Sequence, residues 1–176
     1  MSRAITVKSG STCSSFSCTL NAFSRWRKRL RTASADITLR QCVGPSSKGA
    51  FVGLMVASSL RLPFSYSEPV RDHRAAGLFP VSYPIPKPLE PELKGKRVAI
   101  VNDVINAGSA VRGTLTALRQ CGAQPVAIGT LAVYGLAASE LAATHGVALE
   151  ALASFPSRIW EPSACPLCAK GVPLNA

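Results

Sequence analysis

The stretch VAIVNDVINAGSA, from Val98 to Ala110, decides the fold. It begins with apolar residues typical of a buried strand and continues through a polar turn to a point where a helix can start. The run RVAIV at 97–101 predicts the strand. Apolar residues at helical spacing after Ser109 predict the helix, which Gly122 ends. In an open α/β sheet such a turn lies at the carboxyl edge, where ligands bind.

The rest of the chain alternates expected strands and helices. Strands are predicted at 64–67, 81–83, 125–134, 147–155 and 37–44, the last with Ile37, Leu39, Gln41 and Val43 on one face. We expect a buried helix at 50–60, stopped by Pro63, and a shorter helix at 138–146. A Pro/Gly-rich connection separates the second strand from residue 97. This alternation predicts an α/β fold with a parallel sheet and right-handed crossovers.

Composition indicates one ordinary domain. The chain has 176 residues, of which 47% are hydrophobic and 6% aromatic. The longest apolar run, at 50–60, is too short and too interrupted to span a bilayer, so we expect a cytoplasmic protein with no membrane partner. We divide the chain into a basic Ser/Arg-rich segment at 1–35 and an α/β domain at 36–176.

The net charge of +11 favours an anionic partner, which can be a phosphate ligand, a nucleic acid or a membrane surface. Residues 1–40 hold eight Lys or Arg and one acid, Asp36, and five of the eight lie in RWRKRLR at 25–31. Residues 1–35 fit a transit peptide, a flexible basic arm or the remnant of an ancestral region. The same basic segment keeps nucleic-acid binding as an alternative.

Six cysteines include one CxxC, formed by Cys165 and Cys168. One CxxC supplies two metal ligands, whereas a structural zinc site needs four. We therefore favour buried thiols in a reducing compartment over a metal or redox site.

The turn after residue 101 has the chemistry of a phosphate site. Asn106, Ala107, Gly108 and Ser109 would place small side chains and free N–H groups at a helix N-terminus. Asp103 is expected one step after the strand, where a carboxylate can accept hydrogen bonds from sugar hydroxyls. The alternative is an ordinary turn and an ordinary helix start.

The quoted stretch resembles the PRPP-binding signature of the type I phosphoribosyltransferases: four apolar residues, two acids, two apolar residues and a small Gly-containing turn. Asn102 departs from it, since the family usually has Asp or Glu there. The resemblance extends over roughly 37–174, and within the family the chain looks most like the orotate phosphoribosyltransferases. It implies a Rossmann-like parallel sheet with an N-terminal hood, which is reduced or poorly defined in residues 1–35.

Two further segments are similar to family motifs. EPVRDHR places Arg71, Asp72 and His73 at the spacing of the family's lid, although Glu68 and Arg74 depart from its pattern. GPSSKGA resembles the pyrophosphate loop, with Ser46, Ser47, Lys48 and Gly49 available. Each has a plainer interpretation, a solvated charged loop for the first and a helix start capped by a serine for the second.

The resemblance implies a pentosyltransferase of nucleotide metabolism. It would join orotate to the ribose 5-phosphate of PRPP, forming orotidine 5′-monophosphate in pyrimidine biosynthesis and releasing pyrophosphate. Asp103 would bind the ribose hydroxyls with Asn102, the 106–110 loop would hold the 5′-phosphate, and Arg71 and His73 would act at the pyrophosphate. Mg²⁺ would be held by substrate oxygens, with no direct protein ligand assigned. A homodimer is also implied.

The residue at position 102 bears on whether the chain is an active enzyme or one of the alternatives. An amide can bind a ribose hydroxyl but carries no charge, so Asn102→Asp is expected to raise kcat/KM by on the order of tenfold. The alternatives are a regulator that senses PRPP or nucleotides, and a catalytically weakened relative.

Overall fold

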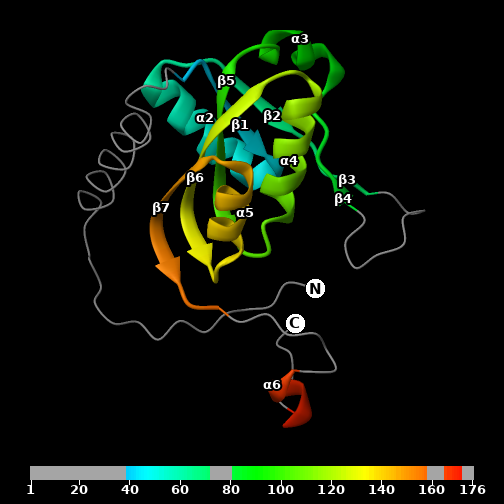
Figure 1. Cartoon of the computed structure of the whole chain (residues 1–176), viewed down its shortest axis with the longest axis vertical. Helices are drawn as coiled ribbons and strands as arrows, with labels where there is room; N and C mark the ends of the chain where they lie inside the picture. The colour runs from blue at the N-terminus through cyan, green and yellow to red at the C-terminus, as the bar shows by residue number, and fades with distance from the viewer. Residues whose placement is uncertain (1–38, 72–80, 158–164, 172–176) are drawn as a thin grey trace.

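The computed structural model describes residues 39–71, 81–157 and 165–171. Five parallel strands form one sheet in the order β2-β1-β5-β6-β7 (Figure 1). They are β1 (Gln41–Pro45), β2 (Phe64–Ser67), β5 (Arg97–Ile105), β6 (Gln124–Tyr134) and β7 (Ala148–Phe155). Every ladder in this sheet is parallel, which confirms the predicted α/β class.

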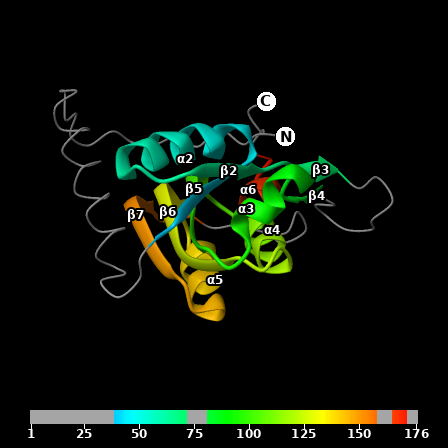
Figure 2. The same ribbon diagram turned by 90° about the horizontal axis from the view of Figure 1, so that it is seen from above.

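Helices cover the sheet on both faces. Helix α2 (Ser46–Leu60) lies on one face, and α4 (Ser109–Gln120) and α5 (Ala137–His145) lie on the other (Figure 2). Three short helical segments complete the described chain: η1 (Lys87–Leu89), α3 (Glu90–Leu93) and α6 (Pro166–Ala169).

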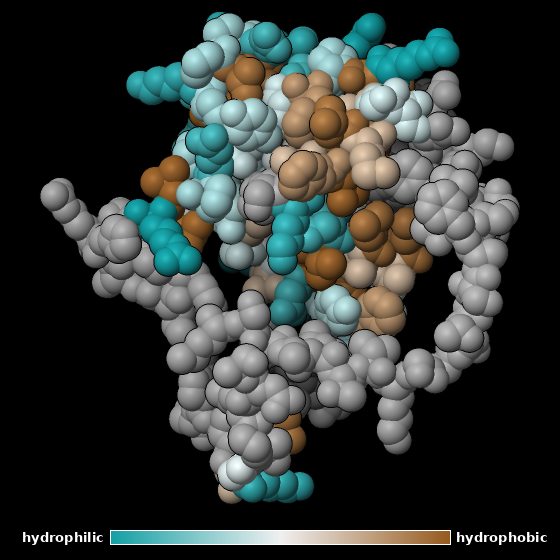
Figure 3. Space-filling model, turned by 180° about the vertical axis from the view of Figure 1, so that it is seen from behind, coloured by the Kyte–Doolittle hydropathy of each residue, from teal (hydrophilic) through white to brown (hydrophobic). Residues whose placement is uncertain are grey.

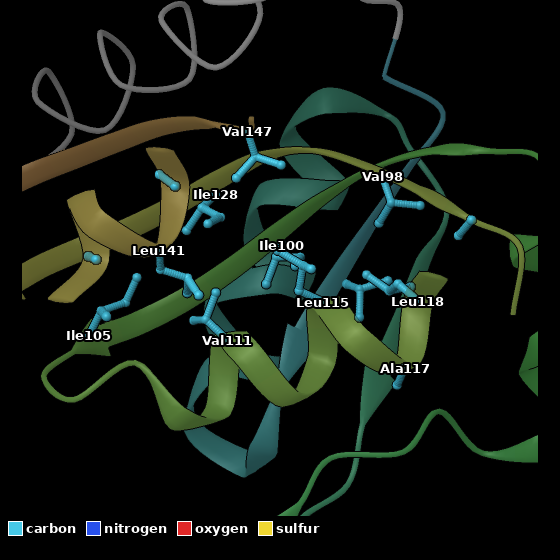
Figure 4. Packing of buried hydrophobic residues seen from close by; sticks show 14 of the residues in the cluster. Val98, Ile100, Ile105, Val111, Leu115, Ala117, Leu118, Ile128, Leu141 and Val147 are labelled. Carbon is cyan, nitrogen blue, oxygen red and sulfur yellow. The ribbon is translucent and has the colours of Figure 1, made fainter. Parts of the chain in front are cut away.

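Strand β5 carries a buried side-chain cluster on each face. Val98 and Ile100 pack with Leu115 and Leu118 of α4 (Figure 4), whereas Ala99 and Val101 belong to the cluster that contains Val56 and Ala57 of α2. Each fully buried Val, Leu or Ile contributes roughly 1.5–3 kcal/mol. Burial on both faces explains why the central strands are continuous apolar runs without polar alternation.

The connection between β2 and β5 contains a small antiparallel pair, β3 (Val70–Arg71) and β4 (Val81–Ser82). The strand expected at 81–83 is therefore present, but it lies outside the main sheet. Sequence analysis missed β3, η1 and α3 because each is only two to four residues long. The expected segment 1–35 lies outside the described residues.

The strand predicted at 97–101 is longer than expected. Strand β5 continues to Ile105 because its ladder with β6 continues, pairing Val104 with Ala132 and Ile105 with Val133. Asp103 therefore lies inside the strand, and the prediction that it follows the strand was wrong.

The start of α2 also differs from the prediction. Strand β1 ends at Pro45, the helix begins at Ser46, and Pro45, the N-cap residue, makes no side-chain capping hydrogen bond. The extended backbone of Pro45, with φ −75° and ψ 136°, leads directly into the helix, so no separate turn is formed, and the N-cap residue is a proline where a serine was expected.

The expectation that the 50–60 helix is buried was wrong. Phe51, Leu54 and Met55 are 71%, 51% and 62% exposed, and apolar surface appears on the side that α2 covers (Figure 3). The helix contacts the sheet along one side only, through Val56 and Ala57. No described helix is long and apolar enough to cross a membrane.

Candidate active site

The predicted site groups meet at one edge of the sheet. The candidate pyrophosphate loop follows β1, the lid segment follows β2, and Asn102 and Asp103 lie near the end of β5. These three strands are neighbours in the order β2-β1-β5 and run parallel. Their carboxyl ends therefore lie at the same edge, although the groups come from positions up to about 60 residues apart in the chain.

Asp103 is a half-buried carboxylate held on a fixed backbone. Its carbonyl oxygen lies 3.1 Å from the hydroxyl of Thr130 on β6, which is fully buried. The same hydroxyl lies 3.1 Å from the carbonyl oxygen of Ala132, so its single proton is shared between two acceptors. Thr130 thus ties the backbone at Asp103 to the neighbouring strand.

The turn after β5 places small residues at the start of α4. Asn106, Ala107 and Ser109 are exposed, and Gly108 precedes α4 with a left-handed backbone, at φ 75°. The amide of Arg112 donates to the carbonyl of Gly108 at 2.9 Å. The preceding amides at the start of α4 have no acceptor within the helix, so they are available to an anion.

A second helix starts at the same edge. Pro45 has no N–H, and the first amides of α2, beginning at Ser46, have no acceptor within the helix. Lys48 is exposed and Gly49 is buried. The four residues of the candidate pyrophosphate loop are therefore the first turn of α2.

Asn102 joins this second helix start to β5. Its side chain is 5% exposed, and its amide nitrogen donates to the carbonyl of Val104 at 3.0 Å. Its amide oxygen faces Gly49 so closely that a Cβ added to Gly49 would lie 2.3 Å from it.

The lid is described only in part. Arg71 lies in β3 and is exposed, whereas Asp72 and His73 fall outside the described residues. The amide of Glu68 donates to the carbonyl of Pro84 at 3.0 Å, which closes the base of the β3–β4 hairpin beside the end of β2. Arg71 therefore extends from the same edge as Asp103.

Sequence analysis missed a pair of buried hydroxyls between β2 and α4. The Oγ of Ser67 and the Oγ1 of Thr114 are 2.6 Å apart, and Thr114 donates to the carbonyl of Ala110 at 2.9 Å. Since a hydroxyl has one proton, Ser67 donates to Thr114. The pair links the end of β2 to the second turn of α4. Only a contact map could have revealed it, because the two residues are 47 positions apart.

An aromatic pair at the ends of β6 and β7 was also missed. The rings of Tyr134 and Phe155 are stacked, with centroids 5.2 Å apart and an interplanar angle of 22°. The two residues are register partners, and Tyr134 follows Val133, the partner of Ile105. An aromatic residue at the end of each predicted strand was the available signal.

Metal-ligand chemistry in the described part of the chain is sparse. No group of three His, Cys, Asp or Glu side chains is close enough there to hold a metal ion. Asp103 offers one carboxylate at the edge, and oxygen is the ligand type that Mg²⁺ prefers. This donor set fits a Mg²⁺ ion that takes most of its ligands from a phosphorylated substrate.

Three cysteines have described side chains: Cys42, Cys121 and Cys165. Burial raises the pKa of Cys42, in β1, to about 12, so its thiol stays protonated at neutral pH. Cys165 is buried, and the side chain of Cys168 is not described, so the prediction about the CxxC pair remains open.

Comparison with known proteins gives the class. A family model described as the phosphoribosyl transferase domain matches residues 27–152. The chain belongs to this family, and its sheet and helices form the fold of the type I phosphoribosyltransferases.

The individual relatives are named after different nucleobases. An orotate phosphoribosyltransferase of Thermotoga maritima is 28% identical over 131 residues, covering 74% of this chain and 63% of the relative. The chain therefore spans less than two thirds of that protein. The orotate phosphoribosyltransferase from Aeropyrum pernix has a TM-score of 0.55 at 24% identity, with coverage of 77% of this chain and 73% of its own. The adenine phosphoribosyltransferase from Saccharomyces cerevisiae, complexed with an imino-altritol bisphosphate and adenine, has a TM-score of 0.61 at 18% identity, covering 78% of each chain.

Proposed function

We propose that this chain is a phosphoribosyltransferase that uses PRPP and Mg²⁺, with orotate as its base. A ring nitrogen of the base forms a bond to C1 of the ribose, and the bond from C1 to the pyrophosphate oxygen breaks. Pyrophosphate leaves with the electron pair of that bond, and the proton of the ring N–H is released to the leaving group or to solvent. The observation that carries the proposal is the meeting of two open helix N-termini and one carboxylate at a single sheet edge.

Each group at the edge has a part in this proposal. The amides of 106–110 hold the 5′-phosphate, and the first turn of α2, Ser46–Gly49, holds the pyrophosphate. Asp103 accepts hydrogen bonds from the ribose hydroxyls and stabilises the positive charge that develops at C1. Arg71 neutralises the leaving group, with His73 assisting there.

Mg²⁺, when bound, supplies positive charge to the leaving pyrophosphate and orients it. Asp103 is the described side chain that can take part in holding it, and the substrate supplies the other oxygens.

The orotate assignment rests on the names of the curated relatives. The stacked rings of Tyr134 and Phe155 offer a flat apolar surface near the end of β5, which suits any planar base. A panel of bases is therefore needed, because an adenine phosphoribosyltransferase has the same fold.

Self-association as a homodimer belongs to the same proposal. The exposed Phe51, Leu54 and Met55 give α2 an apolar outer face, and such faces commonly mark association surfaces. Sedimentation velocity tests it: a dimer is expected, and a monomer at micromolar concentration contradicts it. The cytoplasmic location stays a prediction.

The function is tested by incubating the full chain with PRPP, Mg²⁺ and orotate, uracil, adenine or hypoxanthine, and following pyrophosphate release. Orotate-dependent release is expected. Pyrophosphate release with adenine only would replace orotate by adenine as the assigned base. Stabilisation of the protein by PRPP without turnover with any base would contradict the proposal that the chain is an enzyme.

A regulator that senses PRPP or nucleotides is the second candidate function, and the basic residues of the N-terminal segment favour it. Its test is RNA and DNA affinity against salt concentration. Absence of binding at low ionic strength would eliminate it.

A further inference from the structure

Asn102 occupies a position whose family counterpart is acidic, but its surroundings select an amide. Its Nδ2 donates to the carbonyl of Val104 at 3.0 Å, and this bond sets the orientation of the side chain. A carboxylate has no proton for that carbonyl, so two oxygens would face each other in a site that is 95% shielded from solvent.

The same orientation turns Oδ1 toward the first turn of α2. A Cβ on Gly49 would lie 2.3 Å from Oδ1 and 3.3 Å from Cγ of Asn102, so any larger residue at position 49 would displace the Asn102 side chain from this orientation. Because Gly49 is the fourth residue of α2, Asn102 sits where the helix leaves β1. The oxygen Oδ1 is the negative end of the Asn102 amide dipole, and its position near the N-terminus of α2 is electrostatically favourable.

We infer that Asn102 is a positioning residue, which fixes the first turn of α2 relative to Asp103 instead of binding the ribose. The inference rests on the proposed function, since it concerns the pyrophosphate part of that site. It assigns the ribose to one carboxylate, Asp103. It also reverses the expectation drawn from sequence, because Asn102→Asp removes the donor to Val104.

A double-mutant cycle on Gly49 and Asn102 tests the contact. Gly49→Ala is expected to lower Tm by several degrees, and Asn102→Ala in the same chain is expected to recover most of that loss, because it removes the atoms in conflict. Losses of Tm that simply add would overturn the inference.

A matched control lies one turn along the same helix. The three atoms nearest to a Cβ added at Gly53 would be Cε2 of Phe64 at 2.9 Å and the Cα and N of Gly44 at 3.2 and 3.3 Å, so Asn102 is not among them. Gly53→Ala is therefore expected to cost stability that Asn102→Ala does not recover. Recovery of both glycine variants alike would overturn the specific contact.

Positioning is tested by PRPP, through both its Kd, read from thermal stabilisation, and its KM. Gly49→Ala is expected to weaken PRPP binding by about tenfold with a smaller change in kcat, and the double variant to bind better than Gly49→Ala. Unchanged PRPP binding in a folded Gly49→Ala protein would overturn the positioning role.

Asn102→Asp gives the opposite outcomes for the two roles. A positioning role predicts weaker PRPP binding and a lower Tm, whereas an increase in kcat/KM would show that residue 102 contacts the ribose and would overturn the inference. Failure of the proposed function appears differently, as a wild-type chain that PRPP does not stabilise while the Tm cycle between Gly49 and Asn102 still holds.

Discussion

Two junctions lead from a strand into a helix at the same edge of the sheet, and they are built differently. The first, from β1 to α2, passes through Pro45 with no intervening residue outside strand or helix. The second, from β5 to α4, has three residues between the strand and the helix, and the last of them, Gly108, has a left-handed backbone. Both leave helix amides open at the edge.

The difference lies in what each glycine is needed for. Space decides at Gly49, where an added Cβ would meet Asn102 at 2.3 Å. Backbone conformation decides at Gly108, where φ is 75° and the nearest atom to an added Cβ is 3.9 Å away. The first junction is thus held by a contact across the fold, and the second by local backbone geometry together with the Ser67–Thr114 hydroxyl pair.

The largest effect is expected at Asp103, between the two junctions. Asp103→Asn removes the one assigned negative charge and should lower kcat/KM by about tenfold to a hundredfold, because charged hydrogen bonds are worth about 1.5–3 kcal/mol. PRPP binding should survive, since both helix N-termini remain. Steady-state kinetics measure this, and Glu92→Gln, an exposed acid in α3, is the control. An unchanged kcat would show that Asp103 does not act in the chemical step.

The hydroxyl pair at the second junction should give the next effect. Thr114→Val leaves the Ser67 hydroxyl buried without its acceptor and should lower the free energy of unfolding by about 1–2 kcal/mol. Chemical denaturation measures it. Thr114→Ser keeps the hydroxyl and should cost less than Thr114→Val. If the two variants were equally stable, the hydrogen bond would contribute nothing.

The two glycines should respond oppositely to asparagine. Gly108→Ala should cost about 1 kcal/mol of stability through its positive φ, and Gly108→Asn should cost less, because Asn tolerates this conformation. At Gly49, where space decides, Asn should be worse than Ala. If denaturation ranked the stabilities of the Ala and Asn variants in the same order at both positions, the two glycines would not be required for different reasons.

The smallest effect near neutral pH concerns Cys42, in the strand before the first junction. Burial raises the pKa of its thiol to about 12 in the folded protein, above the ordinary value of 9.0. The stabilisation is therefore complete below pH 9 and is lost as pH rises toward 12. Stability should fall across this range, and Cys42→Ala should fall less steeply, with Cys121 common to both proteins. Parallel curves for the two proteins would show that Cys42 ionises freely.

The sequence anticipated the parallel sheet and the helices that follow β5 and β6, whereas the roles of the candidate site residues stay predictions. A continuous apolar run located β6, and apolar residues at helical spacing located α4, because both are strong local patterns. The apolar pattern misplaced the end of β5, since pairing with β6 keeps Asn102 and Asp103 extended despite their polar side chains. It also misjudged the 50–60 helix, because an apolar sequence does not state how much of its surface the rest of the fold covers.

The sequence encodes the local structure, which is the strand–turn–helix of VAIVNDVINAGSA, and Gly108 supplies a backbone conformation there that few other residues adopt. The approach of Gly49 to Asn102 and the hydrogen bond between Ser67 and Thr114 arise from the tertiary fold. Those contacts join residues about 50 positions apart, and they depend on strand order and register, which no short stretch of sequence encodes.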